Sequence, residues 1–256
     1  MSSRPLVLCL SGLDPSGGAG LQADIESVAA LGGHALGVVT ALTVQDSRNV
    51  ARVVPTDPEL LRQQIDALLD DSPPQAVKLG LLGDVQQLEP LLDLLRACPV
   101  PLVCDPVLRA GGGARLLDPA AAQALRETLF PAVTLLTPNA AEARLLCPQA
   151  PDRDACGEAL LHAGCAHVLI TGGDEPGDSV VNTWYAPGRP PLRYEWPRLP
   201  ETFHGAGCTL AAAAATLLAR GLEMGEALQQ AQEWTQASLR RAFSVGRGRR
   251  IPGRCA

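Results

Sequence analysis

Short apolar runs alternate with longer amphipathic runs along most of this chain, and this alternation constrains the fold more than any other feature. Strands that alternate with helices of about ten to fifteen residues form βαβ units, which build a mostly parallel sheet with helices on both faces. The strand-like runs are residues 5–12, 35–44, 76–80, 101–107, 132–139 and 167–173, and the helical runs are 20–32, 57–71, 84–98, 118–130, 140–147 and 153–165.

The rhythm breaks at residues 178–197, where two β-rich stretches flank a Pro/Gly turn and predict a small β-hairpin. Two helices, 206–220 and 223–243, are expected to close the chain. Because no linker or internal repeat interrupts the pattern, we expect a single domain over residues 1–256. The predicted fold class is α/β, a Rossmann-like three-layer sandwich with a mostly parallel central sheet.

Composition narrows the class of protein. The chain has 46% hydrophobic and 19% charged residues, which is typical of a soluble globular protein. A net charge of -6 and few aromatic residues argue against nucleic acid as a partner, because phosphate backbones need a basic surface. No apolar run has the length of a membrane span and no secretory pattern is present, so we expect a cytoplasmic protein. The basic run at 246–250 is interpreted as a solvated tail.

Eight cysteines are spread along the chain without a C-x-x-C pair, so we expect reduced thiols rather than disulfides or a zinc site. Cys9 and Cys104 lie in strand-like runs, where a thiol behaves as a small apolar group. Cys208 differs because it follows the glycine turn of HGAGC at the start of an alanine-rich helix.

Ligands of open α/β sheets bind beyond the carboxyl ends of the strands, so the segments after each strand are the candidate site. Glycine, aspartate, asparagine and threonine are concentrated there. These segments are SGLDPSGGAG, ALTVQDS, KLGLLGD, CDPVLRAGGG, TPNAAEA, TGGDEPGD and HGAGC. The first is glycine-rich, but it matches neither the dinucleotide fingerprint nor the P-loop.

The HGAGC segment predicts an anion site. Backbone N–H groups of Gly205, Ala206, Gly207 and Cys208 would face a ligand at the positive end of a helix dipole, an arrangement suited to a transferring phosphoryl group. The alternative is an ordinary helix start after a glycine turn. The helix position lowers the pKa of a thiol and nearby phosphates raise it, and the sequence leaves the balance open.

One polar residue at the end of another strand is a candidate for binding an amino-heterocycle. Gln45 ends an apolar strand, and its amide offers both a donor and an acceptor. Asp24 lies on the helix that follows the first strand. For Gln45 a purely structural role is the alternative, and Asp24 is interpreted from its local pattern as a solvated helix charge.

Asn139 and Glu142 lie three residues apart, on one face of a starting helix. Glutamate can hold a hydrated magnesium ion, and asparagine can reach a phosphate or the same water shell. Helix capping is the alternative for this pair. Asp105, at the end of PLVCD, is a second candidate contact for magnesium or nucleotide, and the GGDE run at 172–175 is assigned no role.

In order and spacing, GLDPSGGAGLQAD, TALTVQ, CDPV, TPNAAEA and HGAGCTLAAA resemble the hydroxymethylpyrimidine/phosphomethylpyrimidine kinases of thiamine biosynthesis, within the ribokinase-like superfamily. The resemblance covers about residues 6–250. It implies a ribokinase-like fold, ATP as phosphoryl donor with Mg²⁺, a pyrimidine acceptor and a homodimer.

The resemblance also implies roles for individual residues. Gly12, Asp24 and Gln45 would bind the aminopyrimidine. The residues of the anion hole would be Gly205, Ala206 and Gly207, with Cys208 at the position of the catalytic base. Asn139 and Glu142 would belong to the magnesium and phosphate motif, with Asp105 and Thr171 as further nucleotide contacts.

Two departures from the family pattern stand out. Ala206 replaces the usual threonine of the glycine turn, which removes a hydroxyl and keeps the backbone donors. Thr171 stands where a lysine commonly approaches the phosphates, so we expect magnesium, helix dipoles, Lys78 or Arg109 to neutralise them instead. The alternatives to this function are a pyridoxal-type kinase of the same superfamily and a non-catalytic pyrimidine-binding regulatory protein.

Overall fold

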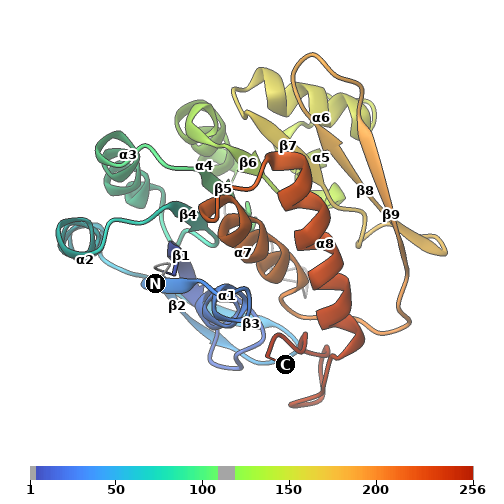
Figure 1. Cartoon of the computed structure of the whole chain (residues 1–256), viewed down its shortest axis with the longest axis horizontal. Helices are drawn as coiled ribbons and strands as arrows, with labels where there is room; N and C mark the ends of the chain where they lie inside the picture. The colour runs from blue at the N-terminus through green and yellow to red at the C-terminus, as the bar shows by residue number, and fades with distance from the viewer. Residues whose placement is uncertain (1–3, 109–118, 256) are drawn as a thin grey trace.

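The computed structural model describes residues 4–108 and 119–255. A nine-stranded sheet lies between two layers of helices (Figure 1). Its strand order is β3-β2-β1-β4-β5-β6-β7-β8-β9. The strands are β1 (Leu6–Leu13), β2 (His34–Gln45), β3 (Val50–Pro55), β4 (Ala76–Leu79), β5 (Leu102–Cys104), β6 (Leu135–Leu136), β7 (His167–Ile170), β8 (Ser179–Tyr185) and β9 (Leu192–Pro197).

The six central strands, from β2 to β7, are parallel, and antiparallel strands form both edges. This confirms the predicted α/β class. The predicted hairpin is also confirmed: β8 and β9 pair and extend the sheet beyond β7. Strand β3 was not predicted; its residues are mostly exposed, and its pairing with β2 defines it.

The helices are close to the predicted ranges. They are α1 (Gly20–Ala30), α2 (Pro58–Asp71), α3 (Leu88–Ala97), α4 (Pro119–Ala124), α5 (Ala140–Leu146), α6 (Arg153–His162), α7 (Ala206–Ala219) and α8 (Met224–Arg240), with short helical turns η1 (Val85–Gln87), η2 (Leu125–Leu129) and η3 (Phe130–Ala132). None of the described helices combines the length and the apolar character needed to cross a membrane.

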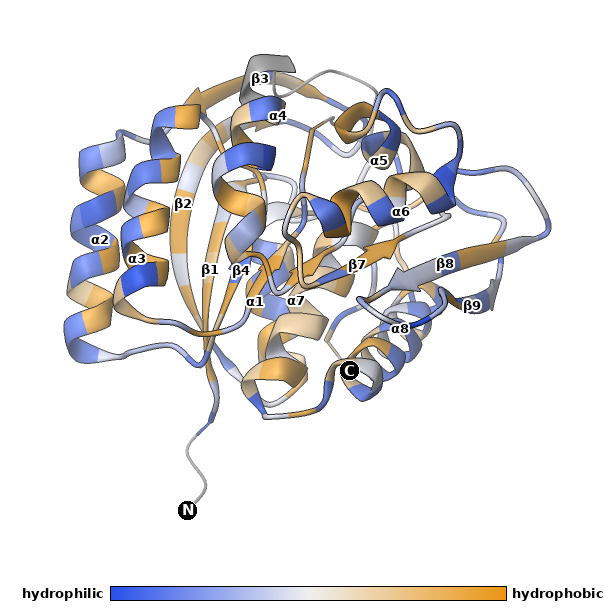
Figure 2. Ribbon diagram, turned by 90° about the horizontal axis from the view of Figure 1, so that it is seen from above, coloured by the Kyte–Doolittle hydropathy of each residue, from blue (hydrophilic) through white to orange (hydrophobic). Residues whose placement is uncertain are grey.

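Successive side chains of the strands point to opposite faces of the sheet and contribute to two separate hydrophobic clusters. From β1, Leu8 and Leu10 belong to a cluster that includes residues of α2, α3, α5 and α6, whereas Val7 and Cys9 belong to a second cluster with residues of α1, α7 and α8 on the opposite face. Figure 2 shows the apolar strands between helices whose polar sides face outward. This arrangement explains why β1 reads as a continuous apolar run: both of its faces are buried.

Alanine gives α7 its place in the fold. Residues 211–215 are all alanine and fully buried, and their small side chains let α7 lie close to the sheet, α1 and α8. Alanine also has the highest intrinsic helix propensity. The first turn of α7 is thereby fixed at the carboxyl ends of the parallel strands.

The C-terminal segment corrects one expectation. Residues 246–250 are not a free solvated tail, because the chain folds back after α8 and pairs with the segment that precedes α7. Arg250 pairs with Phe203, and its backbone carbonyl accepts a hydrogen bond of 2.9 Å from the backbone N–H of His204. Backbone hydrogen bonds hold the segment in place, and such bonds leave no apolar pattern in the sequence. The pairing could therefore not be predicted from these polar residues.

Candidate active site

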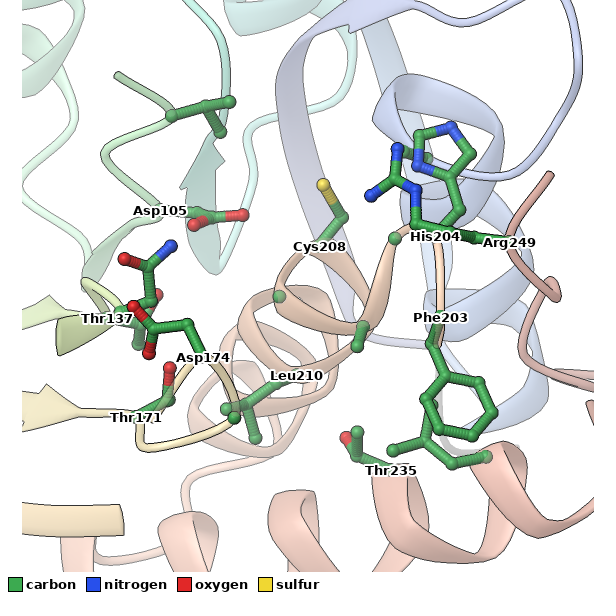
Figure 3. A pocket seen from close by; sticks show the side chains of 18 of the residues that line it. Asp105, Thr137, Thr171, Asp174, Phe203, His204, Cys208, Leu210, Thr235 and Arg249 are labelled. Atoms are coloured by element: carbon green, nitrogen blue, oxygen red, sulfur yellow. The ribbon is translucent and has the colours of Figure 1, made fainter. Parts of the chain in front are cut away.

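A cavity of about 620 Å³ opens at the carboxyl ends of the parallel strands, where the sequence predicted a site. Figure 3 shows side chains that face one another across it, with Asp105, Thr137 and Thr171 on one side and His204 and Arg249 on the other. Of the eleven predicted site residues, Asp24 alone is absent from its lining. The ten that line it are Gly12, Gln45, Asp105, Asn139, Glu142, Thr171, Gly205, Ala206, Gly207 and Cys208.

The turn before α7 depends on glycine. Gly205 has a φ of +85°, and a Cβ there would lie 1.9 Å from the carbonyl oxygen of Gly18. The turn therefore packs directly on the 14–20 loop. Helix α7 begins at Ala206, and the N–H groups of a first helical turn have no partner within the helix. This geometry provides backbone donors and a positive dipole end toward the cavity.

Cys208 lies in that first turn, half-buried. Burial raises the pKa of its thiol to about 12, against the opposing effect of the Lys78 ammonium, and the Asp105 carboxylate adds to the increase. The balance left open by the sequence thus favours the neutral thiol. At neutral pH the Cys208 thiol, which lines the cavity, is therefore protonated.

Lys78 and Asp24 form a buried ion pair behind Cys208. The Lys78 ammonium lies 2.8 Å from the Asp24 carboxylate and 3.0 Å from the Ser11 hydroxyl, and both charged side chains are fully buried. Burial by itself lowers the pKa of Lys78, but Asp24, Cys208 and Asp105 together outweigh burial and the net shift is upward. The Lys78 charge is thus already compensated by protein, and the Asp24 carboxylate is turned toward Lys78 and Ser11.

Carboxyl groups gather on the opposite side of the cavity. Burial raises the pKa of Asp105, with Lys78 opposing and Asp24 adding to the shift. Burial, and after it the Asp105 charge, raise the pKa of Glu142 to about 8, although hydrogen bonds from two backbone N–H groups oppose the shift. These carboxyl groups repel one another in a place where water cannot screen them.

Asn139 and Glu142 also cap α5. The Asn139 amide oxygen accepts from the N–H of Glu142 at 2.8 Å, and Glu142 accepts from the N–H of Asn139 at 3.0 Å. Asn139 and Glu142 therefore do cap the helix, as the alternative interpretation predicted, and both also line the cavity. Neighbouring Thr171 pairs with Asn139 through the backbone, which joins these residues in one half of the site.

The donor set on this side fits magnesium. Mg²⁺ takes one or two carboxylates together with water and phosphate oxygens, and a cation would relieve the repulsion between Asp105 and Glu142. Within the described ranges no group of three or more His, Cys, Asp or Glu side chains is arranged to hold a metal. The residues present thus suit a largely hydrated ion that shares phosphate ligands.

Sequence reasoning missed Asp14 and His204, which organise the opposite half of the cavity. The His204 Nε2 atom lies 2.7 Å from the Asp14 carboxylate and 2.9 Å from the Gln45 amide. Asp14 also accepts from the hydroxyl and N–H of Ser16 and from the N–H of Ala19. Although burial raises the pKa of Asp14, the bonds from His204 and Ser16 outweigh burial and lower it.

The only sequence signal for Asp14 is the DPSG turn pattern, in which an aspartate side chain commonly accepts from the following backbone. Asp174 was also missed, within the GGDE run that we had assigned no role. Its carboxylate accepts from the N–H groups of Ala140 and Ala141 at the start of α5, and it lines the cavity.

Arginines of the C-terminal segment were missed as well. Arg249 lines the cavity beside His204 (Figure 3). Arg254 is almost fully buried and donates to the carbonyl oxygens of Gly17 and Gly18, so the end of the chain holds the 14–20 loop in place. Lys78, named from the sequence as a phosphate partner, is occupied by Asp24, and Arg109 lies outside the described residues.

Known proteins resemble this chain over nearly its whole length. The sequence profile of the phosphomethylpyrimidine kinase family matches residues 14–252. A hydroxymethylpyrimidine/phosphomethylpyrimidine kinase from Synechococcus elongatus is 38% identical over 250 residues, which cover 95% of each chain.

Solved structures support the fold assignment. An ADP complex of Bacillus subtilis pyridoxal kinase superposes with a TM-score of 0.88 and 30% identity, covering 98% of this chain and 97% of that one. A phosphomethylpyrimidine kinase from Clostridium difficile gives 0.79 and 29%, covering 92% of this chain and 100% of that one. The fold is ribokinase-like, and the chain belongs to the phosphomethylpyrimidine kinase family of phosphotransferases.

Proposed function

We propose that this protein transfers the γ-phosphoryl group of MgATP to 4-amino-5-hydroxymethyl-2-methylpyrimidine, here called the pyrimidine alcohol. A second transfer to the resulting monophosphate would give the pyrophosphate, in thiamine biosynthesis. The observation that carries the proposal is the turn at residues 205–208, which aims backbone donors and a thiol at the middle of a cavity with distinct halves. The family assignment supports the same acceptor class.

The acceptor binds in the half formed by Gly12, Gln45 and His204 in this proposal. The Gln45 amide supplies a donor and an acceptor for the edge of an aminopyrimidine, and its contact with His204 holds it in position. Asp24 does not line the cavity. Its ion pair with Lys78 instead holds in position a residue that does. This role revises the direct contact that the family resemblance implies for Asp24.

The nucleotide and magnesium occupy the half formed by Asp105, Asn139, Thr171 and Glu142. Magnesium, when bound, neutralises the phosphate charge that develops during transfer. Asp105 and Glu142 would hold its hydration shell, and Asn139 and Thr171 would contact phosphate oxygens. With a neutral threonine in place of lysine, this half relies on the metal for positive charge.

The chemical step needs positioning and charge stabilisation more than a strong base. The hydroxyl oxygen forms a bond to the γ-phosphorus as the bond from that phosphorus to the β,γ-bridging oxygen of ATP breaks, and ADP leaves. The hydroxyl proton becomes acidic only once the new bond is forming. We therefore assign Cys208 as a relay: its thiol passes its own proton to a phosphoryl oxygen and takes the hydroxyl proton in return.

The decisive experiment measures ATP consumption with each candidate alcohol and identifies the products by mass. We expect turnover with the pyrimidine alcohol, formation of a mono- and then a diphosphorylated product, and loss of turnover in excess chelator. Consumption of ATP with no pyrimidine product would overturn the proposal.

A pyridoxal-type activity is the second candidate, because pyridoxal kinases superpose closely on this chain and pyridoxine also carries a hydroxymethyl group on an aromatic ring. The same assay compares the two alcohols directly. A non-catalytic pyrimidine-binding protein is disfavoured by the presence of Cys208, Asn139 and Glu142 together on one cavity. We further propose that the protein is a single-domain cytoplasmic enzyme and a homodimer, which light scattering at micromolar concentration tests.

A further inference from the structure

Arg249 reaches the cavity from a segment whose backbone is fixed. The N–H of Arg249 donates to the carbonyl oxygen of Ser47 at 3.1 Å, and the N–H of Gly248 donates to the Ser47 hydroxyl at 3.1 Å. A Cβ at Gly248 would lie 2.3 Å from the Ser47 carbonyl oxygen, so the two segments are in direct contact. The position of the Arg249 side chain is thus set by the fold of the 246–250 segment.

Among the residues that the structure describes, no salt bridge joins the Arg249 guanidinium to a carboxylate, and Asp14 is the charged group that acts on its pKa. The guanidinium points into the cavity beside the His204 ring, on the side of Cys208 (Figure 3). Its Nε atom is buried without a hydrogen-bond partner among the residues that the structure describes. Burial lowers its pKa against the opposing effect of Asp14, so the charge is held in an unfavourable place that an anionic ligand would make favourable.

The other cationic side chains of the described cavity wall are already engaged. Lys78 is paired with Asp24. Arg198 donates to backbone carbonyl oxygens of the 172–179 loop, among them those of Gly173, Gly177 and Glu175. Within the described part of the chain, Arg249 is therefore the cavity arginine or lysine that is free to bind a ligand.

The position of Arg249 in the cavity indicates which anionic group it could bind. It lies with His204 and Gln45, in the acceptor half, and across the cavity from Thr171 and Asp174 (Figure 3). An acceptor that is a neutral alcohol brings no charge to this half. A phosphate ester would bring up to two negative charges into the cavity that Arg249 and the turn at residues 205–208 both line.

We propose that Arg249 binds the phosphate group of the monophosphate acceptor and so supports the second transfer more than the first. The inference rests on the proposed function. A guanidinium can donate two parallel N–H bonds to phosphate oxygens, which positions the group as well as neutralising it. In the second transfer an oxygen of this phosphate attacks the γ-phosphorus and ADP leaves, while Arg249 keeps its protons and reduces the repulsion between the two phosphates.

The test compares Arg249→Gln with a matched control, Arg247→Gln, since Arg247 is exposed and two residues away. Titration calorimetry without ATP measures the affinity of each protein for the pyrimidine alcohol and for its monophosphate. We expect Arg249→Gln to weaken monophosphate binding by roughly 10- to 100-fold, the usual effect of losing a charge-assisted hydrogen bond, and alcohol binding by less than about threefold. Arg249→Lys should recover part of the loss, and Arg247→Gln should match wild type.

Kinetics provides the second readout. The loss in kcat/KM should be at least about tenfold larger for the monophosphate than for the alcohol in Arg249→Gln, and thermal unfolding establishes that the variant is folded. Equal losses for both acceptors, or no loss for the monophosphate, would overturn the inference and leave the proposed function intact. A wild-type protein that binds neither pyrimidine would overturn both.

Discussion

The ammonium of Lys78 and the carboxylate of Asp24 lie 2.8 Å apart with both side chains fully shielded from solvent. Lys78 is the single lysine of the chain, so the sequence places its one ammonium side chain in the interior. The pair lies next to Cys208 and Asp105, and its charges enter the pKa of each. The ion pair thus contributes to the electrostatics of the cavity as well as to folding.

Lys78→Met should destabilise the protein strongly. The substitution leaves the Asp24 carboxylate buried without a cation, and breaking one side of a buried pair costs about 3–5 kcal/mol. Urea unfolding measures the loss. The double substitution Lys78→Met with Asp24→Leu should recover most of it, because it removes both charges; a single variant as stable as wild type would contradict the prediction.

Gln45→Leu should weaken binding of the pyrimidine alcohol and leave ATP binding nearly unchanged. One hydrogen bond to a buried heterocycle is worth about 1–3 kcal/mol when its partner is left unsatisfied. Calorimetric titration with each ligand measures the two affinities separately. Equal losses for alcohol and ATP would indicate a folding defect, and the assignment of Gln45 to the acceptor half would then be withdrawn.

Asp24→Ala requires a stability control that Gln45→Leu does not. Asp24 is the partner of the buried Lys78, so its removal strands an ammonium in the interior and any loss of pyrimidine affinity includes that disturbance. The family resemblance implies a direct contact with the pyrimidine for both residues, and the amide chemistry of Gln45 favours the same role. Their different burial separates them: Gln45 lines the cavity and Asp24 does not.

Glu142 should make the stability of the ligand-free protein fall as the pH rises. Burial and the charge of Asp105 raise its pKa from 4.5 to about 8, so the folded protein binds more protons than the unfolded chain within this window. Stability therefore decreases between about pH 4.5 and pH 8, with a slope of at most about 1.4 kcal/mol per pH unit. Urea unfolding across this range measures the slope.

The matched control is Glu142→Gln, whose amide oxygen retains an acceptor for the N–H of Asn139 at the start of α5. We expect the variant to have a flatter dependence of stability on pH. Saturating magnesium and ATP should flatten the dependence in wild type, because a bound cation favours the ionised carboxylate. An unchanged slope in Glu142→Gln would contradict the prediction.

Much of the fold was predictable from local patterns. The continuous apolar run of β1 is typical of a strand buried on both faces, and the alanine-rich run of α7 is typical of a helix. The glycine turn before α7 indicates where that helix begins. Strand β3 was not predictable in this way, because it is defined by its pairing with β2 and its side chains are mostly exposed.

The missed site residues share a different cause. Asp14 and His204 are 190 residues apart in sequence, and the bond from Arg254 to Gly18 spans 236 residues. Neither contact leaves a local pattern, and a basic run such as 246–250 resembles a solvated tail unless its backbone partners are known. The protonation state of Cys208 could not be predicted for the same reason. Its pKa depends on burial and on Lys78 and Asp105, which are distant from it in the sequence.

Cys208 provides the sharpest test of the chemical step. With a pKa of about 12 the thiol is protonated at neutral pH, and in the proposed relay it exchanges one proton for another. Cys208→Ala removes the relay and should lower kcat by roughly 10²–10⁴-fold, the usual contribution of a positioned acid–base group. Binding of ATP and of the pyrimidine alcohol should persist, because the backbone donors of Gly205, Ala206 and Gly207 remain.

Cys208→Asp separates the relay from a packing role. A carboxylate can accept the hydroxyl proton, so this variant should be more active than Cys208→Ala, although its charge near Asp105 and the phosphates should keep it below wild type. If Cys208 only fills space at the helix start, Cys208→Ala should be nearly as active as wild type. Cys208→Asp should then be the worse variant, because it buries a charge without use. Steady-state rates of the two variants at saturating substrates therefore decide between relay and packing by their order alone.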